Sequence, residues 1–250
     1  MRLIDETGYT RYSALEFVNN VYSVGPRKIL FWDTCGLFEI LRFNYRQEPA
    51  NTIDAIIAIL NWVESDQVYS VASELTLKEW NDNNADVYNK QVADLVLTTR
   101  YHHMATDAIN KLKGASLQSA TLSGQGLEDV LEEIAVRIIN KTYFIKTDEA
   151  ANEAIIRLSN HTAPAFKKGK SEAKDCVIWE TMLALSRSIA SHPDGPSLLP
   201  LKRIFFTVNT DDFANKSVVP YVFQSVLLSE AVTNSFHCSL TFADVEANLV

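Results

Sequence analysis

Short apolar runs that are typical of buried strands alternate along the chain with segments whose apolar residues follow helical spacing. The strand candidates are residues 29–32, 67–73, 203–208 and 235–242. The clearest amphipathic helix covers residues 52–64, where Ile53, Ile56, Leu60 and Val63 share one face. Strands that alternate with helices predict an α/β fold, a three-layer sandwich around a mainly parallel central sheet.

The chain of 250 residues shows no convincing linker and no internal repeat, so we expect one domain over residues 1–250. Residues 85–112 have a long helical pattern, which predicts one long helix or a bent pair. The loop-like residues 114–126 and a further amphipathic helix follow. We therefore expect residues 85–145 to form a helical insertion packed on the α/β core.

Composition excludes several classes of protein. No apolar stretch approaches the roughly 18 residues that cross a bilayer, and the first residues lack an apolar signal core, so we expect a cytoplasmic protein without membrane contact. The three cysteines are far apart, which favours reduced packing residues. The net charge of −8 argues against non-specific coating of nucleic acid, but it is compatible with a nuclease whose acids bind metal.

Acidic residues follow the ends of predicted strands or open the helices after them. They are Asp33, Glu74, Asp175, Asp211 and Asp212. Ligands of open parallel sheets bind beyond the carboxyl ends of the strands, so these side chains are expected to converge. Converging carboxylates repel one another unless a cation neutralises them, and oxygen ligands suit Mg²⁺ or Mn²⁺. The pattern predicts a metal site in which Asp33 is a ligand.

Each acid taken alone has a simpler interpretation. Asp33 is placed to cap a helix, and Glu74 and Asp175 are placed to complement the dipole of a helix that they open. Asp211 and Asp212 are also typical of a turn. Only the joint placement of all these acids favours the metal site.

Four segments together resemble the PIN-domain ribonucleases, in particular their larger bacterial members. The segments read ILFWDT, ASELTLKEW, KDCVIWE and FFTVNTDDF, and the last contains the family's T-x-N-x-x-D-F signature intact. The resemblance covers residues 28–80 and 166–242. It implies a parallel sheet with helices on both sides and an endoribonuclease that depends on Mg²⁺ or Mn²⁺.

The resemblance also implies roles for individual residues. Asp33, Glu74, Asp175 and Asp212 would be the catalytic, metal-binding acids. Asn209 would support the site, Thr34 and Thr207 would support it through their hydroxyl groups, and Asp211 is a rival to Asp212. A metal-bound water would attack the phosphodiester, so no histidine is needed as a base.

A basic loop directly precedes Asp175. Lys167, Lys168 and Lys170 are placed to bind a substrate phosphate and to steer an anion toward the metal. The alternative is a solvated loop without a role in binding.

Two functions remain open at this point. The first is a metal-dependent endoribonuclease acting on RNA, with single-stranded DNA as the other substrate class. The second is a non-catalytic PIN-like module that binds RNA or a protein, against which the full set of acids argues. The size of the chain favours a stand-alone nuclease over a toxin with an antitoxin partner. Residues 85–145 are as compatible with a homodimer contact as with a substrate guide.

Overall fold

The computed structural model describes the whole chain except residues 1, 44–48, 50, 166–172 and 199–200. In this described part, six parallel strands form one sheet in the order β1-β4-β3-β2-β5-β8. Their bounds are β1 Arg11–Tyr12, β2 Lys28–Trp32, β3 Val68–Ser73, β4 Thr142–Ile145, β5 Arg203–Phe206 and β8 His237–Ser239. A separate antiparallel pair joins β6 (Ala214–Asn215) to β7 (Val222–Phe223).

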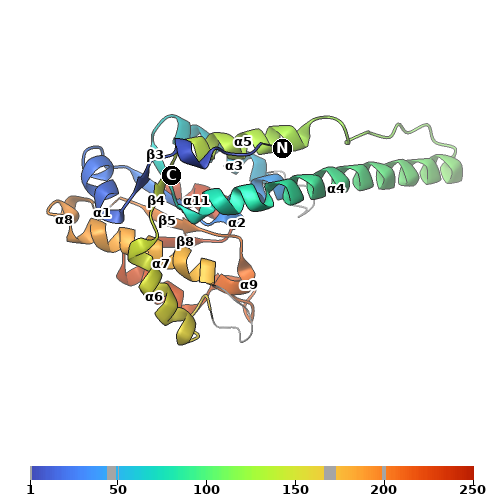
Figure 1. Ribbon diagram of the computed structural model, residues 1–250. Coiled ribbons are helices and arrows are strands. Elements are labelled where there is room, and N and C mark those ends of the chain that lie inside the picture. The colour runs from blue at the N-terminus through green and yellow to red at the C-terminus, as the bar shows by residue number, and fades with distance from the viewer. Residues whose placement is uncertain (1, 44–48, 50, 166–172, 199–200) are drawn as a thin grey trace.

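Helices cover both faces of the sheet, which confirms the predicted α/β sandwich (Figure 1). One layer contains α2 (Thr34–Arg42), α3 (Asn51–Glu64), the first part of α4 (Leu75–Lys113), α5 (Leu127–Asn140) and α11 (Phe242–Leu249). The other contains α1 (Ala14–Phe17), the π-helical turn Val18–Tyr22, α7 (Ala173–Ser191) and α10 (Ser225–Thr233), with α6 (Asp148–Ser159) packed on α7. Short helices at Glu6–Gly8, Gly195–Leu198 (α8) and Thr210–Phe213 (α9) complete the described elements.

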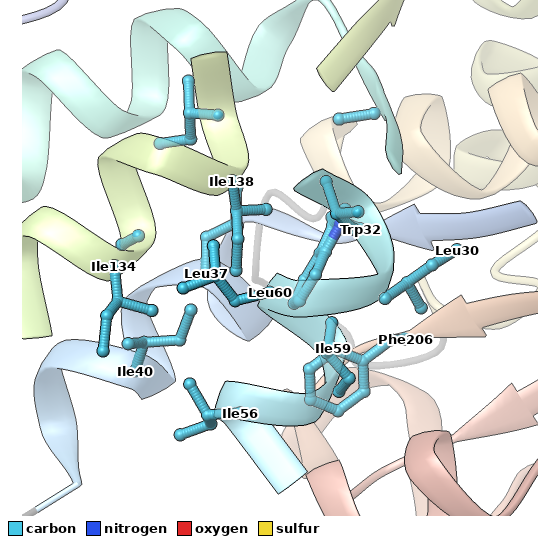
Figure 2. Packing of buried hydrophobic residues seen from close by; sticks show 14 of the residues in the cluster. Leu30, Trp32, Leu37, Ile40, Ile56, Ile59, Leu60, Ile134, Ile138 and Phe206 are labelled. Atoms are coloured by element: carbon cyan, nitrogen blue, oxygen red, sulfur yellow. The ribbon is translucent and has the colours of Figure 1, made fainter. Parts of the chain in front are cut away.

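Strand β2 is buried on both faces, as a central parallel strand must be. Leu30 and Trp32 belong to one core, whereas Ile29 and Phe31 belong to the other, because successive side chains point to opposite sides. Figure 2 shows Leu30, Trp32 and Phe206 of the sheet beside the apolar residues of helices α2, α3 and α5. The two cores fix β2 and β5 side by side, and this fixes the edge at which both strands end.

Gly36 in α2 allows this helix to lie directly on the sheet. A Cβ atom at this position would lie 2.9 Å from Cδ1 of the buried Phe206 ring. We expect Gly36→Ala to lower the free energy of unfolding by about 1 kcal/mol, because overpacking outweighs the gain in helix propensity. Chemical denaturation measures this change. Gly8→Ala, where the added Cβ would meet nothing within 4 Å, is the control and should cause no comparable loss.

The segment 85–145 is not a helical insertion as a whole, because its last part belongs to the α/β core. Helix α4 is one continuous helix that ends at Gly114 with φ of +63°, and residues 114–126 then return alongside it (Figure 1). Helix α5 contributes to the core, and β4 is an internal strand of the sheet. Only Lys141 separates α5 from β4, so the sequence has no turn signal there.

None of the helices described is both long enough and apolar enough to span a membrane.

Candidate active site

Asp33 follows β2 directly and lies where the carboxyl ends of β2 and β5 meet. Its backbone N–H donates to the carbonyl oxygen of Phe206 at 2.9 Å, and its side chain is only 2% exposed. Asp33 occupies the N-cap position of α2, and the amide groups of Thr34 and Cys35 in the first turn act on its carboxylate. Its Oδ2 also accepts a hydrogen bond of 2.5 Å from the hydroxyl of Thr207, which follows β5. The simpler interpretation, a helix cap, does not explain this second contact.

Burial raises the pKa of Asp33 to about 6, since the ionised carboxylate loses its hydration. The Thr207 hydrogen bond opposes this rise, the negative charge of Glu79 adds to it, and the amide groups of Cys35 and Thr34 again oppose it. The site therefore holds a buried carboxylate for which the described residues show no ion pair. A bound cation would remove this energetic cost.

Asn209 connects Asp175 and Asp212. Its Nδ2 donates to Oδ2 of Asp212 at 3.1 Å and to Oδ1 of Asp175 at 3.4 Å. Its Oδ1 accepts from the backbone N–H of Asp212, which caps α9. The backbone N–H of Asn209 in turn donates to the Thr207 hydroxyl oxygen at 3.0 Å. Thr207 and Asn209 thus link Asp33 on one side with Asp175 and Asp212 on the other.

The pKa of the Cys35 thiol is affected by several of these acids. Its pKa is raised well above the ordinary value, first by burial and then by the negative charges of Asp33, Asp175 and Glu79, while Arg42 opposes the shift. Three carboxylates from β2, α7 and α4 therefore lie near one side chain in the first turn of α2.

The carboxylate of Glu74 has partners other than Thr207 and Asn209. Its Oε1 accepts hydrogen bonds from the backbone N–H and the hydroxyl of Thr147, at 2.9 and 3.0 Å. Its Oε2 lies 3.5 Å from Nε of Arg11. The side chain of Glu74 therefore joins the loop after β4 to β1, although its backbone follows β3 next to the end of β2.

Glu79, which the sequence analysis missed, is the glutamate of this segment that lies beside Asp33. Its Oε2 accepts a hydrogen bond of 2.5 Å from the Thr34 hydroxyl, and its Oε1 lies 3.0 Å from Nζ of Lys174. Trp80 stacks on Phe38 with ring centroids 5.1 Å apart, which holds the start of α4 against α2. The available signal was helical spacing, because Glu79 lies three residues after the buried Thr76.

The remaining predicted residues are Asp211 and the three lysines of the basic loop. Asp211 is exposed and pairs with Lys216, whereas Asp212 is buried. Lys167, Lys168 and Lys170 lie outside the described residues. The described positive charges near the acids include Lys174 at Glu79, Arg42, which acts on Cys35, and Lys216, which interacts with Asp211 and Asp212.

Two cavities flank the acids. One, of about 230 Å³, runs between α2 and α4 and is lined by Thr34, Cys35, Phe38, Arg42, Glu79, Asn83, Asp86, Val87 and Lys90. The other, of about 320 Å³, lies beside α9 and the β6–β7 pair and includes Asp211, Asn215, Lys216 and Gln224. Glu79 lines the first cavity, and the second is lined by Asp211, the neighbour of Asp212.

The donor chemistry fits a hard divalent cation, since the converging groups are carboxylates supported by an amide and two hydroxyls. Within the described residues, no three His, Cys, Asp or Glu side chains form a group that could already hold a metal ion. The acids instead form pairs that Asn209 and Thr207 connect, with Asp33 left ionised at an energetic cost. The residues suit the cation by charge and donor type.

Fold and site together define an α/β protein with an acidic centre at the carboxyl ends of adjacent parallel strands. A model of the PIN-domain family matches residues 30–213, and the chain belongs to this family. PIN domains are generally nucleases, and they typically use divalent metals. Comparison with curated proteins finds no match, and comparison with solved structures finds none either.

Proposed function

We propose that this PIN-domain protein is a nuclease that depends on Mg²⁺ or Mn²⁺ and hydrolyses phosphodiester bonds of RNA. The observation that carries the proposal is the convergence of four acids. Asp33, Glu79 and Asp175 all act on Cys35, and Asn209 joins Asp212 to Asp175. Glu79 replaces Glu74 in the set that the sequence suggested, because Thr147 and Arg11 hold Glu74 elsewhere.

The residues of the site have different proposed roles. Asp33, Glu79, Asp175 and Asp212 hold the cation, and Asn209 keeps Asp175 and Asp212 beside each other. Thr207 orients Asp33, and Thr34 orients Glu79. When bound, Mg²⁺ or Mn²⁺ supplies an activated water and stabilises the charge that develops on the phosphate.

The cavity between α2 and α4 offers a path for the substrate backbone. Arg42 and Lys90 line it, Lys90 paired with Asp86 at 2.6 Å, and Lys174 lies at Glu79. Positive groups thus accompany the acids within a chain whose net charge is −8. These cations attract phosphates locally, where the net charge of the chain repels them. Lys167, Lys168 and Lys170 remain proposed phosphate contacts on the sequence evidence alone.

The proposal also includes the location, the domain organisation and the partners of the protein. We place the nuclease in the cytoplasm as a single domain, acting without an antitoxin partner, and single-stranded DNA remains its alternative substrate class.

The test is cleavage of a mixed pool of labelled RNA and labelled single-stranded DNA by the full chain. We expect RNA to be cut in Mn²⁺ or Mg²⁺ and to remain intact in EDTA, because the acids act through the cation. Cutting of the DNA alone would correct the substrate class. Intact nucleic acid under every condition would overturn the nuclease and favour a non-catalytic binding module.

A further inference from the structure

Helix α4 is far longer than the domain needs. It contains 39 residues, and beyond Leu95 the only members of the helix that are buried are Thr99 and Thr106. Figure 1 shows that its outer part extends away from the sheet, with the returning chain alongside. We call residues 90–126 the arm. An apolar core does not explain the arm, since it has none beneath it.

The returning chain covers one face of the arm helix. Thr99 Oγ1 accepts from the backbone N–H groups of Leu122 and Ser123, at 3.0 and 2.9 Å. Asn110 exchanges two hydrogen bonds of 2.9 Å with the backbone of Leu117. The covered face thus runs through Thr99, Thr106 and Asn110, which are spaced seven and four residues apart.

The opposite face carries an exposed apolar stripe. Its members are Ala93, Leu97, Tyr101, Met104, Ala108 and Leu112. Tyr101, Met104 and Leu112 are 60%, 57% and 86% exposed. Each of the first three members is followed by another member 11 residues later, which is close to three helical turns. The stripe therefore runs parallel to the helix axis, over about 29 Å. A continuous apolar surface of this kind on a projecting helix is typical of a protein contact.

We propose that the apolar stripe binds the same stripe of a second copy of this chain, with the two helices antiparallel. Alignment about a point between His102 and His103 sets Tyr101 opposite Met104, a favourable aromatic–thioether contact. The same alignment sets Leu97 opposite Ala108 and Leu112 opposite Ala93, so a large side chain meets a small one in both further pairs.

Charges beside the stripe select the antiparallel direction. Arg100 and Asp107 lie on the same flank of the stripe, and in an antiparallel pair like flanks face each other. Arg100 then comes within about 3 Å, measured along the axis, of Asp107 of the second copy, and the reciprocal pair forms as well. A parallel pair would instead place Arg100 and Asp107 beside Thr98, Ala105 and Ile109, which carry no charge. The acid of that flank, Asp94, lies six residues from Arg100, or about 9 Å along the axis.

This arrangement leaves the proposed nuclease sites open and is independent of whether they cleave. Glu79 lies near the start of α4, and the pairing lies near its end. Two copies would therefore place their acidic groups about 70 Å apart along the common axis.

Sedimentation of the full chain across about 1–100 µM tests the proposal. We expect a dimer for the wild type, and at least about tenfold weaker association for Tyr101→Glu, because a charge would replace the central ring of the stripe. Ile155→Glu, at an equally exposed apolar residue of α6, is the matched control and should remain dimeric. A monomeric wild type, or a Tyr101→Glu variant that dimerises like the control, would overturn the proposal.

A charge exchange tests the direction of pairing. Arg100→Asp and Asp107→Arg are each expected to weaken the dimer, and the double variant should restore it, because each ion pair then re-forms with its charges reversed. A double variant that associates no better than the two single variants would overturn the antiparallel arrangement. Far-ultraviolet circular dichroism confirms that each variant is folded.

Discussion

Asp33→Asn is expected to slow metal-dependent cleavage by about 1000-fold or more. The substitution keeps the shape of the side chain and its contact with Thr207, but it removes the charge that the cation needs at the centre of the site. Initial rates under saturating Mn²⁺ measure the effect. Asp82→Asn makes the same change at an exposed position of α4 and should leave the rate within a few-fold. Equal rates for both variants would exclude Asp33 from the site.

The same substitution is expected to stabilise the protein when metal is absent. The carboxylate of Asp33 is ionised at neutral pH despite its burial, and its pKa of about 6 compares with an ordinary value of 3.8. At pH 7.5 this difference in pKa lowers the free energy of unfolding of the wild type by about 3 kcal/mol. Asn at position 33 carries no charge, so the variant does not have this loss. Denaturation in EDTA measures the gain. Lower activity together with higher stability would show that Asp33 serves the function of the protein and not its folding.

The stability gained by Asp33→Asn depends on pH. Because the folded-state pKa of Asp33 is raised, the folded protein binds more protons than the unfolded chain between pH 3.8 and about 6. Stability therefore falls as the pH rises through this window, and the full loss is reached above about pH 6. Asp33→Asn should match the wild type near pH 3.8 and exceed it at pH 7.5. A difference that is the same at both pH values would contradict this assignment.

Glu79→Gln is expected to reduce cleavage by about 100-fold or more, whereas Glu74→Gln should change the rate less than about threefold. The two residues are a matched pair, since both are glutamates near the start of α4. Glu79 acts on Asp33 and accepts from Thr34, while Glu74 holds Thr147. The glutamine at position 74 still accepts the hydrogen bonds of Thr147, so its effect on folding should also be small.

Cleavage rates of the two variants, measured side by side, decide between the two glutamates. A large loss in Glu74→Gln with an active Glu79→Gln would restore the assignment made from the sequence. It would also mean that the start of α4 moves when the cation binds.

Much of the fold could be predicted because its strands are buried on both faces. Apolar runs such as Leu30–Trp32 and Ile204–Phe206 are then nearly continuous, and each stops abruptly at a polar residue. Those stops mark the edge of the sheet. The first led to Asp33, whereas Thr207 lay inside the predicted strand 203–208 and was named from the family resemblance. Strand β4 was missed because α5 precedes it by one residue, so apolar helix and apolar strand form one uninterrupted pattern.

The choice between Glu74 and Glu79 depends on tertiary packing and not on local pattern. Both residues suit the beginning of a helix, and the sequence shows no difference in charge or spacing that separates them. The stacking of Trp80 on Phe38 sets the rotation of α4 and turns Glu79 toward Asp33. Such a contact between α2 and α4 joins residues 42 positions apart, which periodicity within one helix does not reveal.

Calorimetric titration of Mn²⁺ into the metal-free protein, with Asp33→Asn beside the wild type, tests the central claim directly. The acids are proposed to hold a divalent cation, so the wild type should bind Mn²⁺ saturably and the variant should lose most of that binding. Binding should also raise the thermal stability of the wild type alone. Wild-type protein that binds no Mn²⁺, or a variant that binds it equally well, would contradict a metal centre at Asp33.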